Sequence, residues 1–316
     1  MKKILFTLSI LTAIGVNAQD TRKDILSDAS MTITKDKADT TSKPWLLGGV
    51  LNLNGAQTNL SNWSAGGDDY SLSINALADL HAYYKKGKQN WDNMLTFNYG
   101  YIKTTSLGNR KNSDRIDLLS RYGYSLNKNW EFGGLFNFRT QAFAGYTYGT
   151  TDNVTTKTYS SNFFSPAYVS IGPGFTYHPT NNNNLNIYIS PASARWIIVS
   201  SKFLNNQGLY GVDSGKTIKT QIGAYLSANY TTNITKTLSY IGRLDLFSDY
   251  LDKPQNVYMY MTNMFALKIS KILSATWNYN MIYDDKTRLF GPTGKGARLQ
   301  TQSIIGVGIL YKFDNK

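Results

Sequence analysis

The sequence predicts an all-β fold: a transmembrane, antiparallel up-and-down β-barrel of 12 strands with short periplasmic turns and longer external loops. Three observations lead to this prediction: an export signal, a two-residue alternation of apolar and polar side chains, and a contrast between short and long connections. The composition agrees, because Glu131 is the only glutamate and good helix formers are scarce, whereas the chain holds 23 Tyr and 26 Gly. The absence of cysteine excludes structural disulfides and thiolate chemistry.

The first predicted element is a secretory signal peptide over residues 1–18. Lys2 and Lys3 form its positive start, residues 4–16 are apolar but too short to cross a bilayer, and Val16-Asn17-Ala18 has the small-residue pattern of a cleavage site. Residues 19–44 carry balanced charges and few large apolar side chains, so we expect a flexible periplasmic segment there. The predicted barrel occupies residues 45–316.

The strands follow from the alternation, which is clearest near the end of the chain. Ile305, Val307 and Ile309 share one parity, and Gly306 and Gly308 share the other. A period of two places these sets on opposite faces of a strand. The same test predicts 12 strands, in order over residues 45–54, 70–84, 91–102, 115–126, 130–145, 168–178, 185–199, 218–230, 238–250, 257–269, 273–283 and 299–313.

Most predicted strands have one apolar face about ten residues long, which is the span of a bilayer-crossing strand. Ile74, Ala76 and Leu80 lie on such a face of the second strand, with Ser73 and Asn75 on the other face. In a soluble sandwich the outward polar faces would be rich in Lys and Glu. Here they are rich in Gly, Ser, Thr and Asn, which favours a crowded barrel interior with lipid outside.

The connections between the predicted strands alternate in length. Short ones cover 85–90, 127–129, 179–184, 231–237 and 270–272, longer ones cover 55–69, 103–114, 146–167, 200–217 and 284–298, and only 251–256 breaks the contrast. This alternation is typical of bacterial outer-membrane barrels, so we expect the protein in the outer membrane of a Gram-negative cell. Trp91 and Trp130 each follow a short turn and are typical of an aromatic girdle at the membrane interface.

One segment carries a family resemblance. After the first strand the chain reads Gln57-Thr58-Asn59-Leu60-Ser61-Asn62-Trp63-Ser64-Ala65-Gly66-Gly67, followed by Tyr70-Ser71-Leu72-Ser73 and later by Trp91-Asp92-Asn93. This resembles the Bacteroidota outer-membrane β-barrel family known as domain of unknown function 3078. The likeness covers most of the chain after the signal, and its specific motif is Asn62 to Gly67. The resemblance implies a fold and a location but no activity.

The loop motif of Gln57, Asn62, Trp63, Gly66 and Gly67 has two interpretations. In one, the loop folds into the barrel mouth as a plug or contacts a partner, and the two glycines permit the backbone angles needed. In the other, Trp63 packs on the barrel rim and the glycines serve a turn.

Strand parity directs charged side chains of both signs into the lumen. Hairpin register then suggests partners: a turn over 127–129 sets Asp117 opposite Arg139, and pairing Tyr230 with Leu238 sets Lys219 opposite Asp249. We therefore expect two lumen ion pairs, Asp117–Arg139 and Lys219–Asp249. The full inward set is Arg121, Arg139, Lys219, Arg243, Lys268 and Lys312 against Asp79, Asp117, Glu131, Asp245 and Asp249.

The nearly balanced lumen suggests a narrow channel or transporter for small polar solutes. The alternative is a non-conducting structural or accessory subunit of an outer-membrane assembly. A third hypothesis is an integral hydrolase built on Asp79 and His81. No nucleophile elbow or metal-ligand spacing occurs in the sequence, so we expect no enzyme and no catalytic, cofactor or metal residues.

The expected partners follow from export and charge. The barrel faces outer-membrane lipid, and basic residues near the external loops are suited to lipopolysaccharide phosphates. Another outer-membrane protein is a possible partner, whereas nucleic acid is not expected for an exported chain. The basic loop residues are Lys103, Arg110, Lys111 and Arg115 in one loop and Lys286, Arg288, Lys295 and Arg298 in the last.

Overall fold

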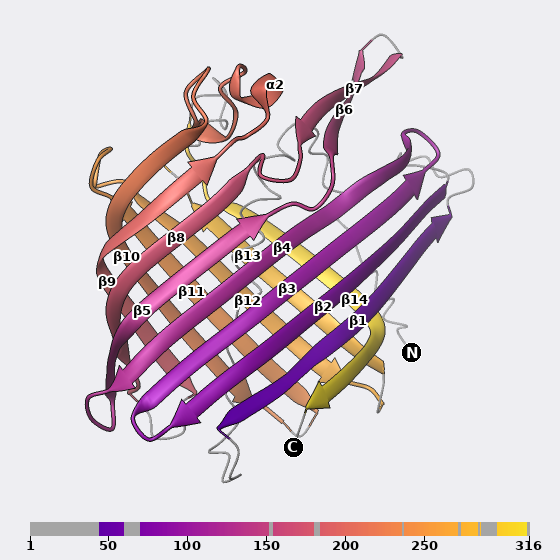
Figure 1. Ribbon diagram of the computed structural model, residues 1–316. Coiled ribbons are helices and arrows are strands. Elements are labelled where there is room, and N and C mark those ends of the chain that lie inside the picture. Colours follow the sequence, from indigo (N-terminus) through magenta and orange to yellow (C-terminus); the bar gives the residue numbers. More distant parts are fainter. Residues whose placement is uncertain are drawn as a thin grey trace, which may run out of the picture.

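The computed structural model is an antiparallel β-barrel (Figure 1), which confirms the predicted fold class. It describes residues 44–59, 70–151, 154–179, 184–235, 237–270, 273–283, 285 and 296–314. The predicted signal peptide over 1–18, residues 19–43 and the motif residues Asn62, Trp63, Gly66 and Gly67 lie outside these ranges, as do Lys286, Arg288 and Lys295.

Within the described residues, twelve strands form one closed sheet in which every neighbouring pair is antiparallel. Chain neighbours pair throughout, except that β5 pairs with β8 and the first strand closes the barrel against the last. These strands are β1 (Trp45–Asn59), β2 (Tyr70–Lys86), β3 (Gln89–Thr104), β4 (Gly108–Ser125), β5 (Trp130–Thr140), β8 (Ala167–Tyr177), β9 (Leu185–Ile198), β10 (Ile218–Asn233), β11 (Leu238–Asp249), β12 (Val257–Lys268), β13 (Leu273–Tyr283) and β14 (Gln300–Asp314).

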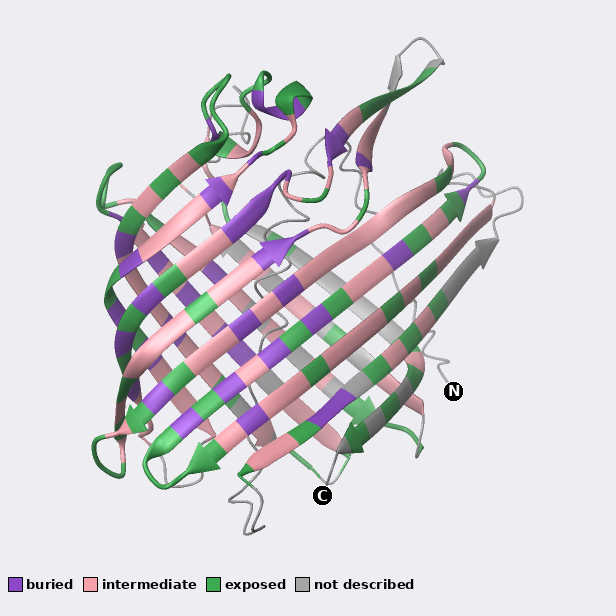
Figure 2. Ribbon diagram, viewed as in Figure 1, coloured by how far each residue is buried: buried purple, intermediate pink, exposed green. Residues whose placement is uncertain are grey.

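The surface of this barrel is inverted relative to that of a soluble protein. Large apolar side chains such as Leu53, Phe132 and Ile309 are exposed on the outer face, whereas Asp92 and Asp117 are buried on the inner one. Figure 2 shows the resulting alternation of buried and exposed residues along the strands. Charged side chains are almost never fully buried unless paired, and exposed apolar bands of this kind are covered by lipid in membrane barrels.

The two ends of the barrel differ. At one end, which we call the turn end, short turns join the strands, as where Asn127 to Asn129 link β4 and β5. At the other, the loop end, the connections β5–β8 and β9–β10 carry structure of their own (Figure 1). Near the turn end the ring of Trp45 lies 5.1 Å from that of Tyr84 and 5.8 Å from that of Trp91, and Trp130 lies 4.6 Å from Tyr177.

Several predicted boundaries need correction at the loop end. The expected long loop over 103–114 is a turn of residues 105–107, because β3 and β4 continue as a ladder beyond the apolar band. Residues 108–114 are polar on both faces, which hides the strand from a test for alternation. Strand β5 ends at Thr140 rather than at 145, and the loop expected over 146–167 contains a hairpin of β6 (Gly145–Thr151) and β7 (Val154–Ser161) outside the barrel sheet.

The β9–β10 connection folds into a small apolar cluster, which we call the mouth cluster. It contains α2 (Lys202–Asn205) and the single-turn helix η2 (Leu209–Gly211). Its buried members are Tyr168, Ile197, Val199, Leu204 and Val212. Tyr159 of β7 packs against it, and the Tyr210 hydroxyl donates a hydrogen bond to the carbonyl of Ser160, so the β6–β7 hairpin is attached to this loop. In the described part of the chain, no helix has the length and apolar character needed to traverse a bilayer.

Candidate functional site: the lumen and its arginine pocket

The lumen side chains lie in layers, and the first layer, at the turn end, surrounds the single glutamate. Asn90 donates a hydrogen bond of 2.7 Å to Glu131, whose other carboxylate oxygen lies 3.5 Å from Nε2 of His178. The Glu131 side chain therefore points into the lumen, as predicted. Gly123 lies beside it, since a Cβ at that position would be 2.8 Å from the Glu131 carboxylate.

The next layer is a shielded ion pair between neighbouring strands. Arg121 of β4 donates to Asp92 of β3 at 2.7 Å, and the two side chains are 15% and 1% exposed. Above it, towards the loop end, Met94, Leu119 and the partly buried Leu135 form an apolar layer. Because these three come from β3, β4 and β5, they cover this side of the lumen with hydrocarbon.

The next layer of lumen side chains towards the loop end is polar. Thr96 donates to Asp79 at 2.5 Å, and Asn137 donates to Asp117 at 2.7 Å. Thr96 and Asp117 are both fully buried. Arg115 interacts electrostatically with both aspartates, so a residue expected near an external loop contributes instead to the charge balance of the lumen.

On the far wall the corresponding layer is a triad of β10 and β11. Arg243 is bound to Asp245 through contacts of 2.9 Å and 2.7 Å, and it also donates to the Tyr225 hydroxyl at 3.0 Å. Tyr225 in turn donates to Asp245 at 2.9 Å. Both Arg243 and Asp245 are buried. The side chains of Arg243 and Asp245 therefore point into the lumen, as predicted.

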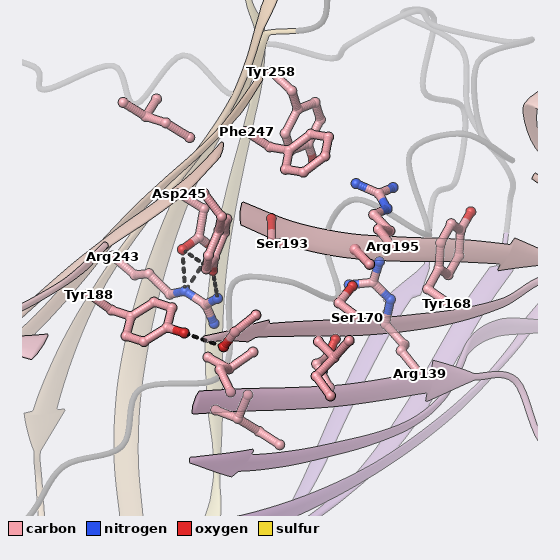
Figure 3. A pocket seen from close by; sticks show the side chains of 18 residues that line it. Arg139, Tyr168, Ser170, Tyr188, Ser193, Arg195, Arg243, Asp245, Phe247 and Tyr258 are labelled. Atoms are coloured by element: carbon pink, nitrogen blue, oxygen red, sulfur yellow. Dashed lines mark hydrogen bonds and ion pairs between the residues drawn. The ribbon is translucent and has the colours of Figure 1, made fainter. Parts of the chain in front are cut away.

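A cavity of about 80 Å³ opens between these walls, and we call it the arginine pocket (Figure 3). Among the described residues, three guanidinium groups, from Arg139, Arg195 and Arg243, line it, together with the carboxylate of Asp245. The Tyr168 ring lies 4.8 Å from the Arg139 guanidinium carbon and 5.4 Å from that of Arg195, which is also 5.9 Å from Phe247. The described residues that line the arginine pocket are Leu119, Leu135, Asn137, Arg139, Tyr168, Ser170, Ile171, Gly172, Tyr188, Ser193, Ala194, Arg195, Tyr225, Arg243, Asp245, Leu246, Phe247 and Tyr258.

The two predicted cross-strand pairs have different outcomes. Asp117 lies directly opposite Arg139, so that register is confirmed. Asp117 accepts a hydrogen bond from Asn137, and the Arg139 guanidinium lies over the Tyr168 ring. Arg139 lines the pocket.

The register proposed for Lys219 and Asp249 is wrong. Strand β10 continues to Asn233, which pairs with Ser239, so the turn is shorter than the expected 231–237 and Asp249 lies opposite Gly223. Lys219 instead pairs with Ile197 of β9, and Gln221 donates to Asp249 at 3.1 Å. The shift is an even number of residues, so each strand keeps its face.

Among the described residues, sequence reasoning missed the lumen charges Asp92, Arg115 and Arg195. Asp92 shares the parity of Met94 and Thr96 and was open to the same test. Arg195 was hidden by a bulge in β9, where the registers with both neighbouring strands shift by one residue. The available signal was Pro191, because proline inside a strand marks an irregular ladder.

The hydrolase hypothesis stays a prediction, and its two residues, Asp79 and His81, both lie on β2. The Asp79 carboxylate accepts the Thr96 hydroxyl, and the His81 ring stacks on Tyr83 at 4.6 Å. No group of metal-binding side chains occurs in the ranges that the structure covers. Of the loop motif, only Gln57 lies within those ranges, where its backbone pairs with Leu72 in the β1–β2 ladder.

Comparisons with solved structures find barrels of similar form. The translocator domain of the autotransporter NalP from Neisseria meningitidis has 10% identity and a TM-score of 0.41, with 93% of this chain and 95% of that chain covered. The COG4313 outer membrane channel from Pseudomonas putida F1 has 11% identity and a TM-score of 0.42, covering 89% and 100%. The NanC porin has 11% identity and a TM-score of 0.39, covering 83% and 98%.

These TM-scores are too low to support a transfer of function, so a function must be inferred from the residues of this chain. No curated protein sequence matches it. Residues 56–146, which include strands β2 to β5, match the family described as "Protein of unknown function (DUF3078)". The match agrees with the predicted family over this segment but does not extend over most of the chain, and the link to Bacteroidota stays a prediction.

Proposed function

We propose that the protein is a narrow outer-membrane channel for small polar solutes. An apolar outer face and a charged inner face suit a barrel in lipid. The loop end then faces the exterior and the turn end faces the periplasm. A channel needs no catalytic residue, so the proposal assigns no enzymatic activity to the protein.

The observation that carries the proposed narrowness is the burial of side chains on the lumen face. Thr96, Asp117 and Tyr260 are 0% exposed, and Asp92 is 1% exposed. In an open aqueous pore these inward groups would touch water. Barrels of about eight strands are filled by side chains, while those of 16–18 leave an aqueous channel, so a lumen of intermediate size with buried charges fits a constricted path.

Single-channel current in planar bilayers tests this proposal. We expect the purified, folded protein to give currents far below those of an open porin, and Arg139→Ala to raise them because a side chain lining the constriction is removed. Lys128→Ala, in an exposed turn, is the matched control and should leave the current unchanged. A large and stable porin-like current in the unmodified protein would refute the constriction.

The second candidate is a non-conducting accessory subunit, and one observation favours it. The β6–β7 hairpin projects beyond the barrel at the loop end, with Thr155 and Lys157 exposed (Figure 1). A partner protein would find an accessible surface there. Absence of current from both the unmodified protein and Arg139→Ala would favour this role over a channel.

Lipid and lipopolysaccharide are the proposed surroundings of the barrel. Arg110 and Lys103 lie at the loop end and are suited to phosphate groups. Lys111 has partners within the chain, because it contacts Asp114 at 2.6 Å and the carbonyl of Phe143 at 2.6 Å. The basic surface proposed for lipopolysaccharide is therefore smaller than the sequence suggested.

A further inference from the structure

We propose that Arg195 binds a small oxyanion in the arginine pocket, with the hydroxyl groups of Ser170 and Tyr258 as further donors. Carboxylates and inorganic phosphate share this chemistry, because both accept hydrogen bonds from guanidinium and hydroxyl groups. The proposal rests on the proposed channel function in that it names the class of solute that the lumen would carry. Binding itself can be measured without a current.

The three donors come from two cross-strand pairs in the barrel wall. Ser170 of β8 lies directly opposite Arg195 of β9, and Phe247 of β11 lies directly opposite Tyr258 of β12. Directly opposed residues have Cβ atoms about 4.5–5.5 Å apart and lie on the same face of the sheet. All four residues line the arginine pocket, and Tyr258 interacts electrostatically with Arg195. The two pairs therefore bring a guanidinium group and two hydroxyl groups to one cavity.

These donors are not used within the described part of the chain. In that part, the side chains of Arg195, Ser170 and Tyr258 form no hydrogen bond or ion pair with another residue. A guanidinium group carries five N–H donors, and each hydroxyl group carries one O–H donor. By contrast, Ser193 in the same lining donates to the carbonyl of Gly223 at 2.9 Å. A ligand rich in acceptor oxygens would match the donors that the protein leaves open.

The charges of the lining favour an anion beside Arg195. Asp245 is the one carboxylate among the described lining residues, and it is joined to Arg243 at 2.7 Å and to the Tyr225 hydroxyl at 2.9 Å. Arg139 has a partner within the chain as well. Arg195 thus keeps a positive charge that no described carboxylate neutralises by contact. An oxyanion would supply the opposite charge through charge-assisted hydrogen bonds, which are stronger than those between neutral groups.

Two aromatic rings hold the Arg195 guanidinium group. Its central carbon lies 5.4 Å from the centre of the Tyr168 ring and 5.9 Å from that of Phe247. Figure 3 shows Arg195 between these two rings. A ring face attracts the cation without accepting its N–H groups as an oxygen atom would. Because Tyr168 is also fixed in the mouth cluster, a ligand would find the group already restrained, which reduces the entropy lost on binding.

The cavity limits the size of the ligand. Its volume of about 80 Å³ suits an ion of a few non-hydrogen atoms, such as acetate or phosphate. The hydroxyl groups can serve the additional oxygens of phosphate, and Leu119 and Leu135 can pack against the methyl group of acetate. The geometry points to the oxyanion, and the measurement decides between the two ions.

Equilibrium dialysis tests the proposal, with radiolabelled phosphate in one arm and radiolabelled acetate in the other. The protein is purified in a nonionic detergent and a zwitterionic buffer. We expect saturable binding in at least one arm, displaced by the same unlabelled ion but not by methylammonium, a cation of similar size. Arg195→Gln should weaken this binding about tenfold to hundredfold, and Tyr258→Phe about twofold to tenfold, which are the ranges for lost hydrogen bonds to charged and neutral groups.

Lys216→Gln is the control, because it neutralises an exposed lysine beside Asp213 and should bind like the unmodified protein. Folding of each variant is checked by its heat-dependent mobility on SDS gels. If Arg195→Gln does not fold, Arg195→Lys replaces it, since lysine keeps the charge but lacks the planar fork, and binding should still weaken measurably.

The outcomes separate the site from the channel. Absence of saturable binding of both ions to the unmodified protein would overturn the proposal, and so would unchanged affinity in a folded Arg195 variant. Binding in one arm alone would uphold the site and identify its ligand as a carboxylate or as phosphate. Binding without any single-channel current would uphold the site and refute the channel, whereas current without binding would do the reverse.

Discussion

At the scale of single residues, the lumen is stabilised by charges that are shielded from water and matched locally. Asp92 with Arg121 and Asp245 with Arg243 each join atoms 2.7 Å apart. Taking charges out of water is costly, and their mutual attraction repays the cost only when the geometry is good. Removing one partner of such a pair leaves the other buried and uncompensated.

We therefore expect Asp92→Asn to lower the free energy of unfolding by about 3 kcal/mol or more, and Arg121→Gln to have a similar effect. The double variant should lose less than the sum of the two, because neither charge is then stranded. Urea unfolding in detergent micelles, followed by tryptophan fluorescence, measures this cycle. Asp213→Asn, which breaks an exposed 3.7 Å pair with Lys216, should change stability by less than about 1 kcal/mol. Additive effects of Asp92 and Arg121 would contradict the coupling.

The residue scale also shows where sequence reasoning succeeds and where it stops. Alternation placed Asp117, Arg139 and Arg243 in the lumen, because the ladders around these residues run without a register shift. It did not find Arg195, because one extra residue in β9 exchanges the two faces between Ser190 and Ser193. A bulge is a local departure from the period on which such a prediction depends.

At the scale of elements, the structure assigns the longest ordered extensions to one end of the barrel. The strands β6 and β7 form a separate two-stranded sheet attached to the mouth cluster. Sequence analysis treated this stretch as a loop, because its threonines and tyrosines do not present one apolar face. In the proposed orientation this hairpin lies outside the bilayer, where no apolar face is required.

Single cysteines test which end is external, and the cysteine-free chain makes the labelling clean. Thr155→Cys, exposed in β7, should react with a membrane-impermeant maleimide on intact cells. Lys128→Cys, exposed in the β4–β5 turn, should react only after the outer membrane is permeabilised. The reverse pattern would invert the proposed orientation.

At the scale of the whole molecule, closure depends on one ladder between the first and last strands. Leu51 lies opposite Tyr311 and Leu53 opposite Ile309. All four side chains are exposed on the outer face. The predicted barrel implies that the first and last strands pair, but the alternating pattern did not give their register, because pairing at a distance leaves no trace in local periodicity.

A disulfide across this ladder tests closure directly. Directly opposed residues have Cβ atoms about 4.5–5.5 Å apart, so Leu51→Cys with Tyr311→Cys should oxidise to an intramolecular crosslink. The linked chain, closed into one large loop, should migrate faster than its reduced form on a denaturing gel. Leu51→Cys with Val307→Cys keeps the same face but moves the partner four residues along β14, and it should stay reduced. Equal crosslinking of both pairs would argue against this register.

The same ladder has a consequence for the order in which the chain folds. Strands β1 and β14 are the partners with the greatest separation along the described chain, and joining distant segments costs loop-closure entropy that a hairpin does not. The hairpins therefore form early and the ladder between the ends forms last. Until then two strand edges carry unsatisfied amides and carbonyls, which hydrocarbon cannot solvate. The growing sheet must accordingly keep both edges away from the lipid core, or lay them against another protein's strand, until β14 arrives.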